Sequence, residues 1–198
     1  MRALWIDSGN DPDWVKIANH GFTHLYFDLF DPRITRAYLD AVQAKGYGQG
    51  LYMVTNWPQF AGKTGAEIAK IVSERITACA YTNTRMQFDI EEHDPDLVLA
   101  ILREWRRLRP NHNTSWTMES FQGGWMSPAF VTEIVNVLRV RVVPQYYTGS
   151  MDRIAHDMGL KNMLKAGFPM NMVTGFYDAA DLPLSGWDGF AFTMGRLR

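Results

Sequence analysis

Short runs of strand character alternate with helical patterns along this chain of 198 residues. The strand-like runs are bounded by turn residues, and we expect strands at 3–7, 23–28, 49–55, 85–91, 113–119, 140–147, 171–178 and 188–194. Between them, apolar residues recur at helical spacing at 34–46, 65–80, 95–108, 128–138 and 151–167. Because strands that alternate with helices form parallel sheets, the pattern predicts an α/β fold.

The number of strands narrows the architecture further. Eight is the number of parallel strands that closes a (β/α)8 barrel, for which roughly 200 residues is the lower limit of length. We therefore expect a single domain over residues 1–198, a compact TIM-like (β/α)8 barrel with short loops and one or two helices reduced or missing. An open doubly wound sheet is the alternative, but the segment "DSGNDPD" after the first strand lacks the G-x-G-x-x-G spacing of a phosphate-binding loop.

Four dipeptides mark the switch from strand to helix. They are Asp11-Pro12, Asp31-Pro32, Asp94-Pro95 and Ser127-Pro128. An Asp or Ser side chain accepts hydrogen bonds from the free N–H groups at the start of a helix, and Pro fits the first helical position. We therefore expect these Asp and Ser residues to cap the helices that follow them.

Composition excludes some classes of function. The net charge of −1 gives no overall field that would attract nucleic acid or an anionic membrane. Cys79 is the only cysteine, so the chain forms no internal disulfide, and no apolar run suits a signal peptide or a membrane span. We expect cytoplasmic synthesis, with virion association or lysis as the route to any extracellular substrate, and we expect no cofactor.

The segment "QFDIE" at 87–91 alternates polar and apolar side chains. On a strand, alternate residues face opposite sides, so Phe88 and Ile90 would face the helices while Asp89 and Glu91 face the mouth of the barrel. Carboxylates inside a strand are costly unless something uses them. The pattern therefore predicts that Asp89 and Glu91 are functional groups.

Further polar residues stand where other predicted strands end. Catalytic groups of such barrels sit at the carboxyl ends of the strands. We therefore add as substrate-binding candidates Asp7, Asp28, Glu119, Gln145, Tyr147 and Asp178. Three of these, Asp7, Asp28 and Asp178, are equally explained as caps or turn formers, because loops after strands favour Asp.

Paired carboxyl groups are what cleavage of a glycosidic bond needs. Residues two apart on a strand lie ~6.5–7 Å apart, and their side chains can lean together. Separations of ~5–5.5 Å suit a retaining glycosidase and ~6.5–9.5 Å an inverting one, so both outcomes stay open. Close carboxyl groups also split their titrations, which leaves one protonated to act as a general acid.

Aromatic residues cluster in the segments expected at the same rim. The apolar face of a sugar packs on an aromatic ring, so these residues are candidates for substrate binding. They are Trp57, Phe60, Phe121, Trp125, Tyr146, Tyr147, Tyr177 and Trp187. The alternative for each ring is packing of a loop against the top of the barrel.

Three motifs resemble those of barrel glycosidases: "LWID" with Asp7, "FDIE" with Asp89 and Glu91, and "PQYY" with Gln145 and Tyr146. In these motifs the chain resembles the family 25 lysozyme-like muramidases and, more distantly, the family 18 chitinase-like proteins. The resemblance implies that Glu91 protonates the leaving oxygen. It implies that Asp89 is the nucleophile or orients an N-acetyl group of the substrate.

The chain departs from the chitinase-like pattern at two places. Gln87 stands where the longer acidic motif has Asp, and the C-terminal "AFTMGRLR" contains no Trp. Many barrels of this type serve in phage particles as lysins or as tail components, and by analogy the chain could be phage-encoded.

Three other functions are alternatives to glycoside hydrolysis. A metal-dependent hydrolase would have His-x-His on the first strand, whereas this chain has "WID", and His93 with Glu91 is the one pair expected near the rim. A Ser-His-Asp enzyme would have a G-x-S-x-G elbow, which the sequence lacks. The third is a non-catalytic barrel that serves as a virion tail or capsid component or as a carbohydrate-binding module.

The sequence therefore predicts a glycoside hydrolase that acts on a cell-wall or amino-sugar polysaccharide by carboxylate acid/base catalysis, without a metal. The expected partners are a polysaccharide substrate or surface glycan and virion assembly partners, with no nucleic acid and no membrane.

Overall fold

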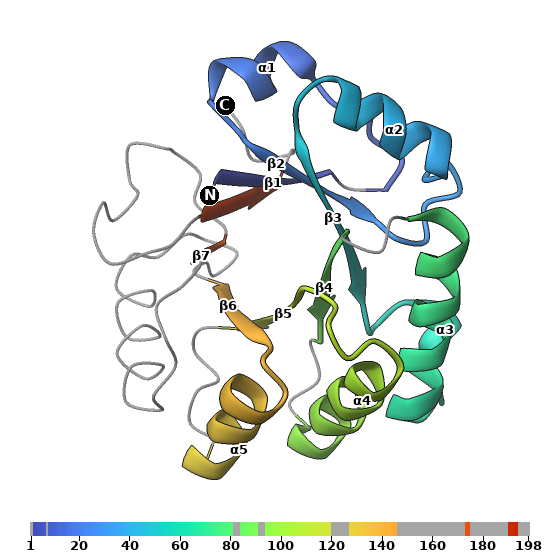
Figure 1. Cartoon of the computed structure of the whole chain (residues 1–198), viewed down its shortest axis with the longest axis vertical. Helices are drawn as coiled ribbons and strands as arrows, with labels where there is room; N and C mark the ends of the chain where they lie inside the picture. Colours follow the sequence, from blue (N-terminus) through green and yellow to red (C-terminus); the bar gives the residue numbers. More distant parts are fainter. Residues whose placement is uncertain are drawn as a thin grey trace.

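The computed structural model describes residues 2–6, 8–80, 84–90, 94–119, 127–145, 173–174 and 190–193. Strands and helices alternate over this part of the chain (Figure 1). The elements are β1 (Arg2–Ile6), α1 (Trp14–Asn19), β2 (His24–Asp28), α2 (Arg36–Ala44), β3 (Gly48–Val54), the 3-10 helix η1 (Pro58–Phe60), α3 (Gly65–Cys79), β4 (Arg85–Asp89), α4 (Pro95–Leu108), β5 (Thr114–Glu119), α5 (Pro128–Thr132), the π-helical turn η3 (Glu133–Val137), β6 (Arg141–Gln145), β7 (Val173–Thr174) and β8 (Phe190–Thr193).

The strands form a parallel sheet in chain order. Strands β1 to β6 pair with their neighbours in sequence, and every pair is parallel. The pairing continues from β6 to the two-residue β7 and then to β8, which lies beside β1. The predicted α/β class is confirmed. The complete barrel of eight βα units stays a prediction, because the segments that connect β6, β7 and β8 lie outside the described residues.

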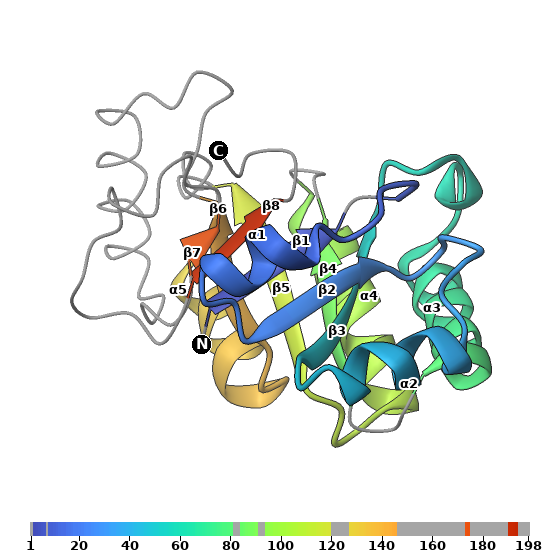
Figure 2. The same ribbon diagram turned by 90° about the horizontal axis from the view of Figure 1, so that it is seen from above.

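The helices follow one another around the outer side of the curved sheet (Figure 1), and the view from above shows β1 to β5 side by side within them (Figure 2). The outward side chains of the strands share one apolar cluster with α2, α3 and α4. Within this cluster, the Phe88 ring of β4 packs edge-on against Trp105 of α4, with 5.1 Å between the ring centroids. Ile90 is buried in the same cluster. The predicted orientation of Phe88 and Ile90 towards the helices is confirmed.

The other face of the sheet carries a second cluster, formed by Ala3, Trp5, Tyr26 and Tyr52. These residues alternate along their strands with the members of the outer cluster, as the two-residue period of a strand requires. Glycine on β3 makes this inner face possible, since a Cβ at Gly50 would collide with the Tyr26 ring. Gly50 therefore leaves room on the inner face for the Tyr26 ring, which a larger residue at this position would displace.

Two of the four predicted helix caps are confirmed. Asp94 accepts hydrogen bonds from the backbone N–H groups of Asp96 and Leu97, at 2.9 and 3.3 Å, and Ser127 caps α5. The predictions for Asp11 and Asp31 were wrong. Helix α1 is capped by Asp13 and α2 by Thr35, since these helices begin at Trp14 and Arg36 and Pro12 and Pro32 lie before their first positions.

Several other predicted boundaries differ from the structure by about two residues, as at the helix predicted over 34–46, which is Arg36–Ala44. The helical pattern at 128–138 is divided into α5 and the π-helical turn η3. The helix expected at 151–167 and most of the strand expected at 171–178 lie outside the described residues.

No helix in the described ranges is both long enough and apolar enough to cross a membrane.

A buried histidine sits between α4 and β5. The ring of His112 packs edge-on against Trp105, with 5.1 Å between ring centroids. Burial lowers the pKa of His112 to about 4, and the charges of Arg109 and Arg106 act in the same direction. The residue therefore stays neutral in the folded protein at mildly acidic pH, where an unfolded chain would bind a proton.

This difference predicts how stability depends on pH. The folded pKa of His112 lies below the unfolded value of 6.5. Its contribution to stability is therefore complete above pH 6.5 and is lost as the pH falls towards 4. We expect the free energy of unfolding to fall by about 2–3 kcal/mol over this range. His112→Phe keeps the contact with Trp105 and should flatten the dependence, as measured by urea denaturation. His20→Phe is the control. Equal pH slopes for wild type and His112→Phe would contradict the assignment.

Candidate active site at the carboxyl ends of the strands

Two buried carboxyl groups end strands β2 and β4. Asp28 is 6% exposed and Asp89 is 8% exposed, and each is the last residue of its strand. The register places Tyr52 of β3 beside Asp28 and Val54 beside Asp89. Because the strands are parallel, both carboxyl groups lie at one edge of the sheet with a single strand between them. Alternation puts them on the inner face, with Tyr26 and Gln87.

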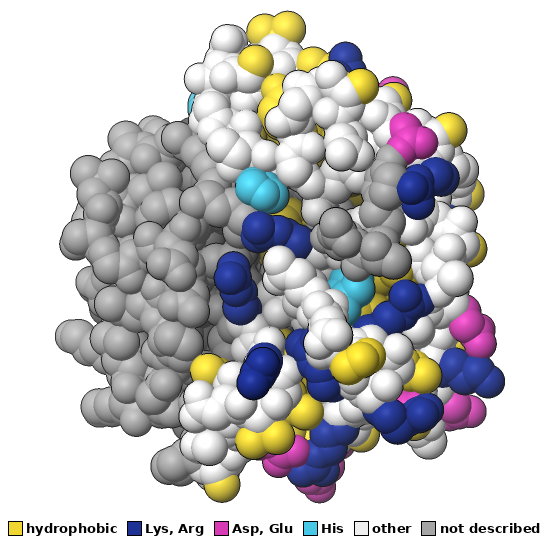
Figure 3. All heavy atoms as spheres, viewed as in Figure 1, with side chains coloured by type: hydrophobic (Ala, Val, Ile, Leu, Met, Phe, Trp, Pro, Cys, Tyr) yellow, Lys and Arg dark blue, Asp and Glu magenta, His cyan; other side chains and the backbone are white. Residues whose placement is uncertain are grey.

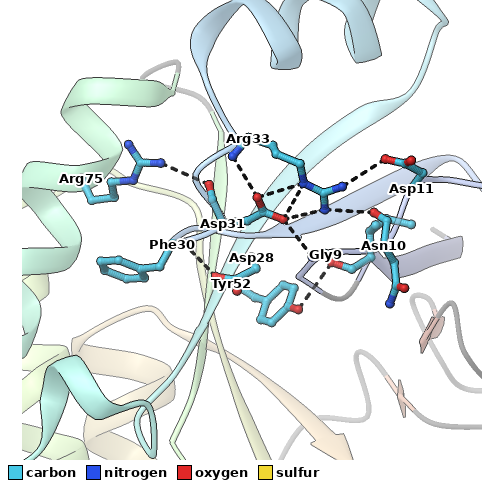
Figure 4. A network of polar contacts seen from close by, with 10 residues as sticks. Gly9, Asn10, Asp11, Asp28, Phe30, Asp31, Arg33, Tyr52 and Arg75 are labelled. Carbon is cyan, nitrogen blue, oxygen red and sulfur yellow. Dashed lines mark hydrogen bonds and ion pairs between the residues drawn. The ribbon is translucent and has the colours of Figure 1, made fainter.

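Asp28 has the environment of an acid/base group. Its Oδ1 accepts a hydrogen bond of 2.7 Å from the backbone N–H of Phe30, and Figure 4 shows it next to the Tyr52 ring. Burial raises the pKa of Asp28, and the negative charge of Asp31 adds to this rise. Hydrogen bonds from Phe30 and from the Ser8 side chain oppose the rise without cancelling it. Asp28 therefore keeps its proton to a higher pH than an exposed aspartate.

Asp89 is held at the junction of β3 and β4. Its carbonyl oxygen accepts a hydrogen bond of 3.0 Å from the backbone N–H of Thr55, the residue after β3. This bond extends the pairing of the two strands by one residue beyond Val54. Glu91 follows two residues later and lies outside the described residues, so the proton-donor role of Glu91 and its separation from Asp89 stay predictions.

The contacts of Gln87 give a reason for Gln, rather than Asp, at this position. Its Oε1 accepts a hydrogen bond of 3.2 Å from Trp5 Nε1, and its Nε2 donates to the hydroxyl of Thr117. The fully buried amide thus links β1, β4 and β5 below the level of Asp89. An ionised carboxylate would accept the bond from Trp5 but would place an uncompensated charge inside the sheet.

A series of aromatic rings runs from the inner face to the segment after β3. Trp5 stacks on Tyr52 at 5.8 Å, and Tyr52 lies 6.2 Å from Trp57, all measured between ring centroids. Trp57 also packs edge-on against Phe30 at 5.9 Å, which in turn contacts Phe60 at 5.4 Å. Trp57 is half-buried, so it combines loop packing with an accessible part of the ring. The packing interpretation given to Trp57 from sequence is confirmed, and its role in substrate binding stays a prediction.

Of the remaining candidate site residues, the structure describes only Glu119 and Gln145. Glu119 and Gln145 are paired residues at the ends of β5 and β6, as their backbones show. The other predicted site residues lie outside the described residues; they are Asp7, Glu91, Trp125, Tyr147, Asp178 and Trp187. The rim aromatics Phe121, Tyr146 and Tyr177 do so as well, and so does His93. Their roles stay predictions.

Tyr52 was not predicted from sequence as a residue of the candidate site. Its hydroxyl donates a hydrogen bond of 3.4 Å to the carbonyl oxygen of Ile6, close to the end of β1. Alternation along "QGLYMV" puts Tyr52 on the face of Gly50 and Val54, which was a usable signal. Its position beside Asp28 depends on strand register, which has no comparable signal in the sequence.

The amino ends of two strands, at the opposite edge of the sheet, carry positively charged residues. Arg85 begins β4 and Arg141 begins β6, and their charges act on the Tyr26 hydroxyl within the sheet. On the face seen in Figure 3, Lys and Arg side chains gather near the middle, with Asp and Glu towards the margin. His24 also lies at this edge, at the start of β2. The residues that the structure describes include no group of three or more His, Cys, Asp or Glu side chains placed to hold a metal ion.

Comparison with known proteins finds no family model, no curated protein and no solved structure that matches this chain. The resemblance to muramidases therefore rests on the three short motifs alone and stays a prediction. The functional argument depends on the geometry of the strand ends.

Neutralising Asp28 should stabilise the fold at neutral pH. Because the folded pKa of Asp28 is raised, its ionised form is less favourable in the folded chain than in the unfolded one. Asp28→Asn keeps an oxygen to accept from Phe30 and removes that cost. We expect a higher midpoint of urea denaturation at pH 7 and none of this gain at pH 3. The exposed Asp40→Asn serves as the control. A lower midpoint at pH 7 would contradict the interpretation.

The buried amide of Gln87 gives a second prediction. Gln87→Glu places a carboxyl group among Trp5, Tyr52 and Thr117 and should reduce the free energy of unfolding by about 2–4 kcal/mol at pH 7. The loss should shrink at pH 4, where the new carboxyl group binds a proton. Gln59→Glu, on the exposed helix η1, should change stability by less than about 0.5 kcal/mol. Equal stabilities of the two variants would show that the amide links are unimportant.

Proposed function

We propose that this chain is a glycoside hydrolase-like (β/α)8 barrel that cleaves a cell-wall or amino-sugar polysaccharide by carboxylate acid/base catalysis. One observation carries the proposal: two buried carboxyl groups, Asp28 and Asp89, share the same edge of a parallel sheet. Tyr52 lies between their strands and Trp57 follows β3. Glycosidic bond cleavage requires a protonated carboxylic acid and a second carboxylate in one cleft.

The proposal assigns the acid to Glu91 and the partner carboxylate to Asp89. Asp89 acts either as the nucleophile or as the group that orients a substrate N-acetyl. The raised pKa of Asp28 supports the proposal, because burial at this edge of the sheet favours the protonated form of a carboxyl group. The proposed substrate-binding residues are Asp7, Asp28, Glu119, Gln145, Tyr147, Asp178, Trp57, Trp125 and Trp187.

The pairing of β8 with both β7 and β1 supports the closed barrel in this proposal. A barrel brings the ends of all its strands to one mouth, which would gather the candidates from β1 to β8 around a single substrate. The polysaccharide or surface glycan is the proposed partner, and delivery by a phage particle or by lysis is the proposed route to it.

A non-catalytic barrel is the second candidate, either a virion tail or capsid component or a carbohydrate-binding module. The observation that favours it is the structural use of the rim residues. Asp28 accepts the turn hydrogen bond from Phe30, and Trp57 packs between Tyr52 and Phe30. Such groups can persist for packing in a barrel that has lost acid/base chemistry.

The two candidates are separated by sugar release from peptidoglycan and from chitin oligomers. Glu91→Gln keeps the shape of the side chain and removes its proton, so we expect a loss of about 10²–10⁴-fold in rate. Glu92→Gln is the matched control at the adjacent position and should retain the wild-type rate.

A folded wild type without activity on either polymer would contradict the glycosidase. In that case, retention on insoluble peptidoglycan that is lost in Trp57→Ala would support the carbohydrate-binding module.

A further inference from the structure

An ion pair between the buried Asp31 and the more exposed Arg33 joins the two connections that flank Asp28. Asp31 lies three residues beyond the end of β2 and is 4% exposed. Its Oδ2 accepts hydrogen bonds from Arg33 Nη2 at 2.6 Å and from the backbone N–H of Gly9 at 3.1 Å, while Oδ1 accepts from the backbone N–H of Arg33 at 2.8 Å (Figure 4). The hydrogen bonds and the positive charge of Arg33 hold the pKa of Asp31 well below its usual range.

Arg33 extends this contact to the connection between β1 and α1. Its Nη1 lies 3.0 Å from Asp11 Oδ1, and its Nη2 donates to the carbonyl oxygen of Asn10 at 3.1 Å. Gly9 has a φ of 83°, a conformation that favours glycine, and its N–H group is directed at Asp31. The guanidinium and the carboxylate together hold residues 9–11.

Helix α3 fixes the other side of the same network. Arg75 Nε donates to the carbonyl oxygen of Leu29 at 3.0 Å, and its Nη2 donates to those of Asp31 and Ile34 at 3.3 and 3.1 Å. The backbone around Asp31 is therefore held by α3, and Asp31 in turn holds residues 9–11. Helix α3 is thus connected through Asp31 to residues 9–11, which follow β1.

Both segments held in this way supply hydrogen bonds to Asp28. Phe30 stands immediately before Asp31 and donates its backbone N–H to Asp28 Oδ1 at 2.7 Å. Ser8 stands immediately before Gly9, and its side chain hydrogen-bonds to the Asp28 carboxyl group. Each donor is thus one residue from a backbone group that the ion pair or Arg75 fixes.

An ion pair contributes little net stability in general, because ordering the side chains and removing water offset the attraction. Where one member is buried, as Asp31 is, the best attested role of the pair is to select one arrangement. The exposed pairs of this chain show the contrast. The carboxylates of Asp40 and Glu74 are 55% and 67% exposed, and both pair with a residue on their own helix. Asp31 alone among these three links two strand-end connections.

We propose that the Asp31–Arg33 pair is a positioning device for Asp28. It holds the β1–α1 connection against the end of β2, so that Ser8 and Phe30 direct the Asp28 carboxyl group towards the sugar. The inference rests on the proposed function, because it takes Asp28 as part of the substrate site. Asp31 and Arg33 do not themselves contact the substrate.

The test needs no substrate in its first part. The titration of the Asp28 carboxyl group is followed by carbon-13 NMR in wild type, Asp31→Asn and Arg33→Gln, together with the amide signals of Ser8 and Gly9. Asp31→Asn removes the negative charge beside Asp28 and keeps the positive charge of Arg33, so the midpoint of Asp28 should fall by about half a pH unit or more, whereas Arg33→Gln should raise it. Arg36→Gln removes an exposed ion pair on α2 and should leave the midpoint unchanged.

Ser8→Ala provides a variant that keeps the ion pair. It removes one donor to Asp28 and should raise the midpoint of Asp28 without changing the amide signal of Gly9. Unchanged midpoints in folded Asp31→Asn and Arg33→Gln would overturn the proposal and leave the pair a purely stabilising role. If those two variants do not fold, an unchanged midpoint in Ser8→Ala would overturn it as well.

The second part measures sugar release. A positioning residue should lower kcat by about 10–100-fold with KM changed less than about threefold in Asp31→Asn. An inactive wild type would contradict the glycosidase while the NMR titrations still decide the positioning of Asp28. Equal loss in kcat and in binding would overturn a specific role of Asp31 in the reaction.

Discussion

The parallel sheet has to bury both of its faces, and the rest of the structure depends on this constraint. The outer face meets the requirement with apolar side chains against the helices, as with Phe88 against Trp105. The inner face holds larger and more polar groups, and its buried amide and indole are satisfied by one another and by Thr117. Gly50 provides the space that the Tyr26 ring needs.

Carboxyl groups are placed where that inner face ends. Asp28 and Asp31 lie three residues apart and have opposite environments. Asp31 has the guanidinium of Arg33 and a lowered pKa, whereas Asp28 depends on neutral donors, and its burial raises its pKa. Pairs of titratable groups pushed apart in this way are typical of acid/base sites.

Much of the fold could be predicted from sequence. The strands predicted at 23–28, 49–55 and 113–119 each agree with the structure within one residue at either end, and α4 has the predicted bounds. The candidate site was predicted in part. Asp28 was expected at the end of its strand and is found there, whereas Asp89 was expected inside a strand of 85–91 and is the last residue of β4. Tyr52 was missed, and Asp31 was wrongly taken as a helix cap because its Pro neighbour resembles a helix start.

For the described elements, the sequence by itself determined their order and the face on which each strand residue lies, because these follow from local periodicity. What only the tertiary structure decided was which residues meet. The bond from Trp5 to Gln87 joins residues 82 positions apart, and that from Gly9 to Asp31 joins residues 22 apart. Such partners depend on strand register and on how the connections pack, and neither leaves a periodic pattern in the chain.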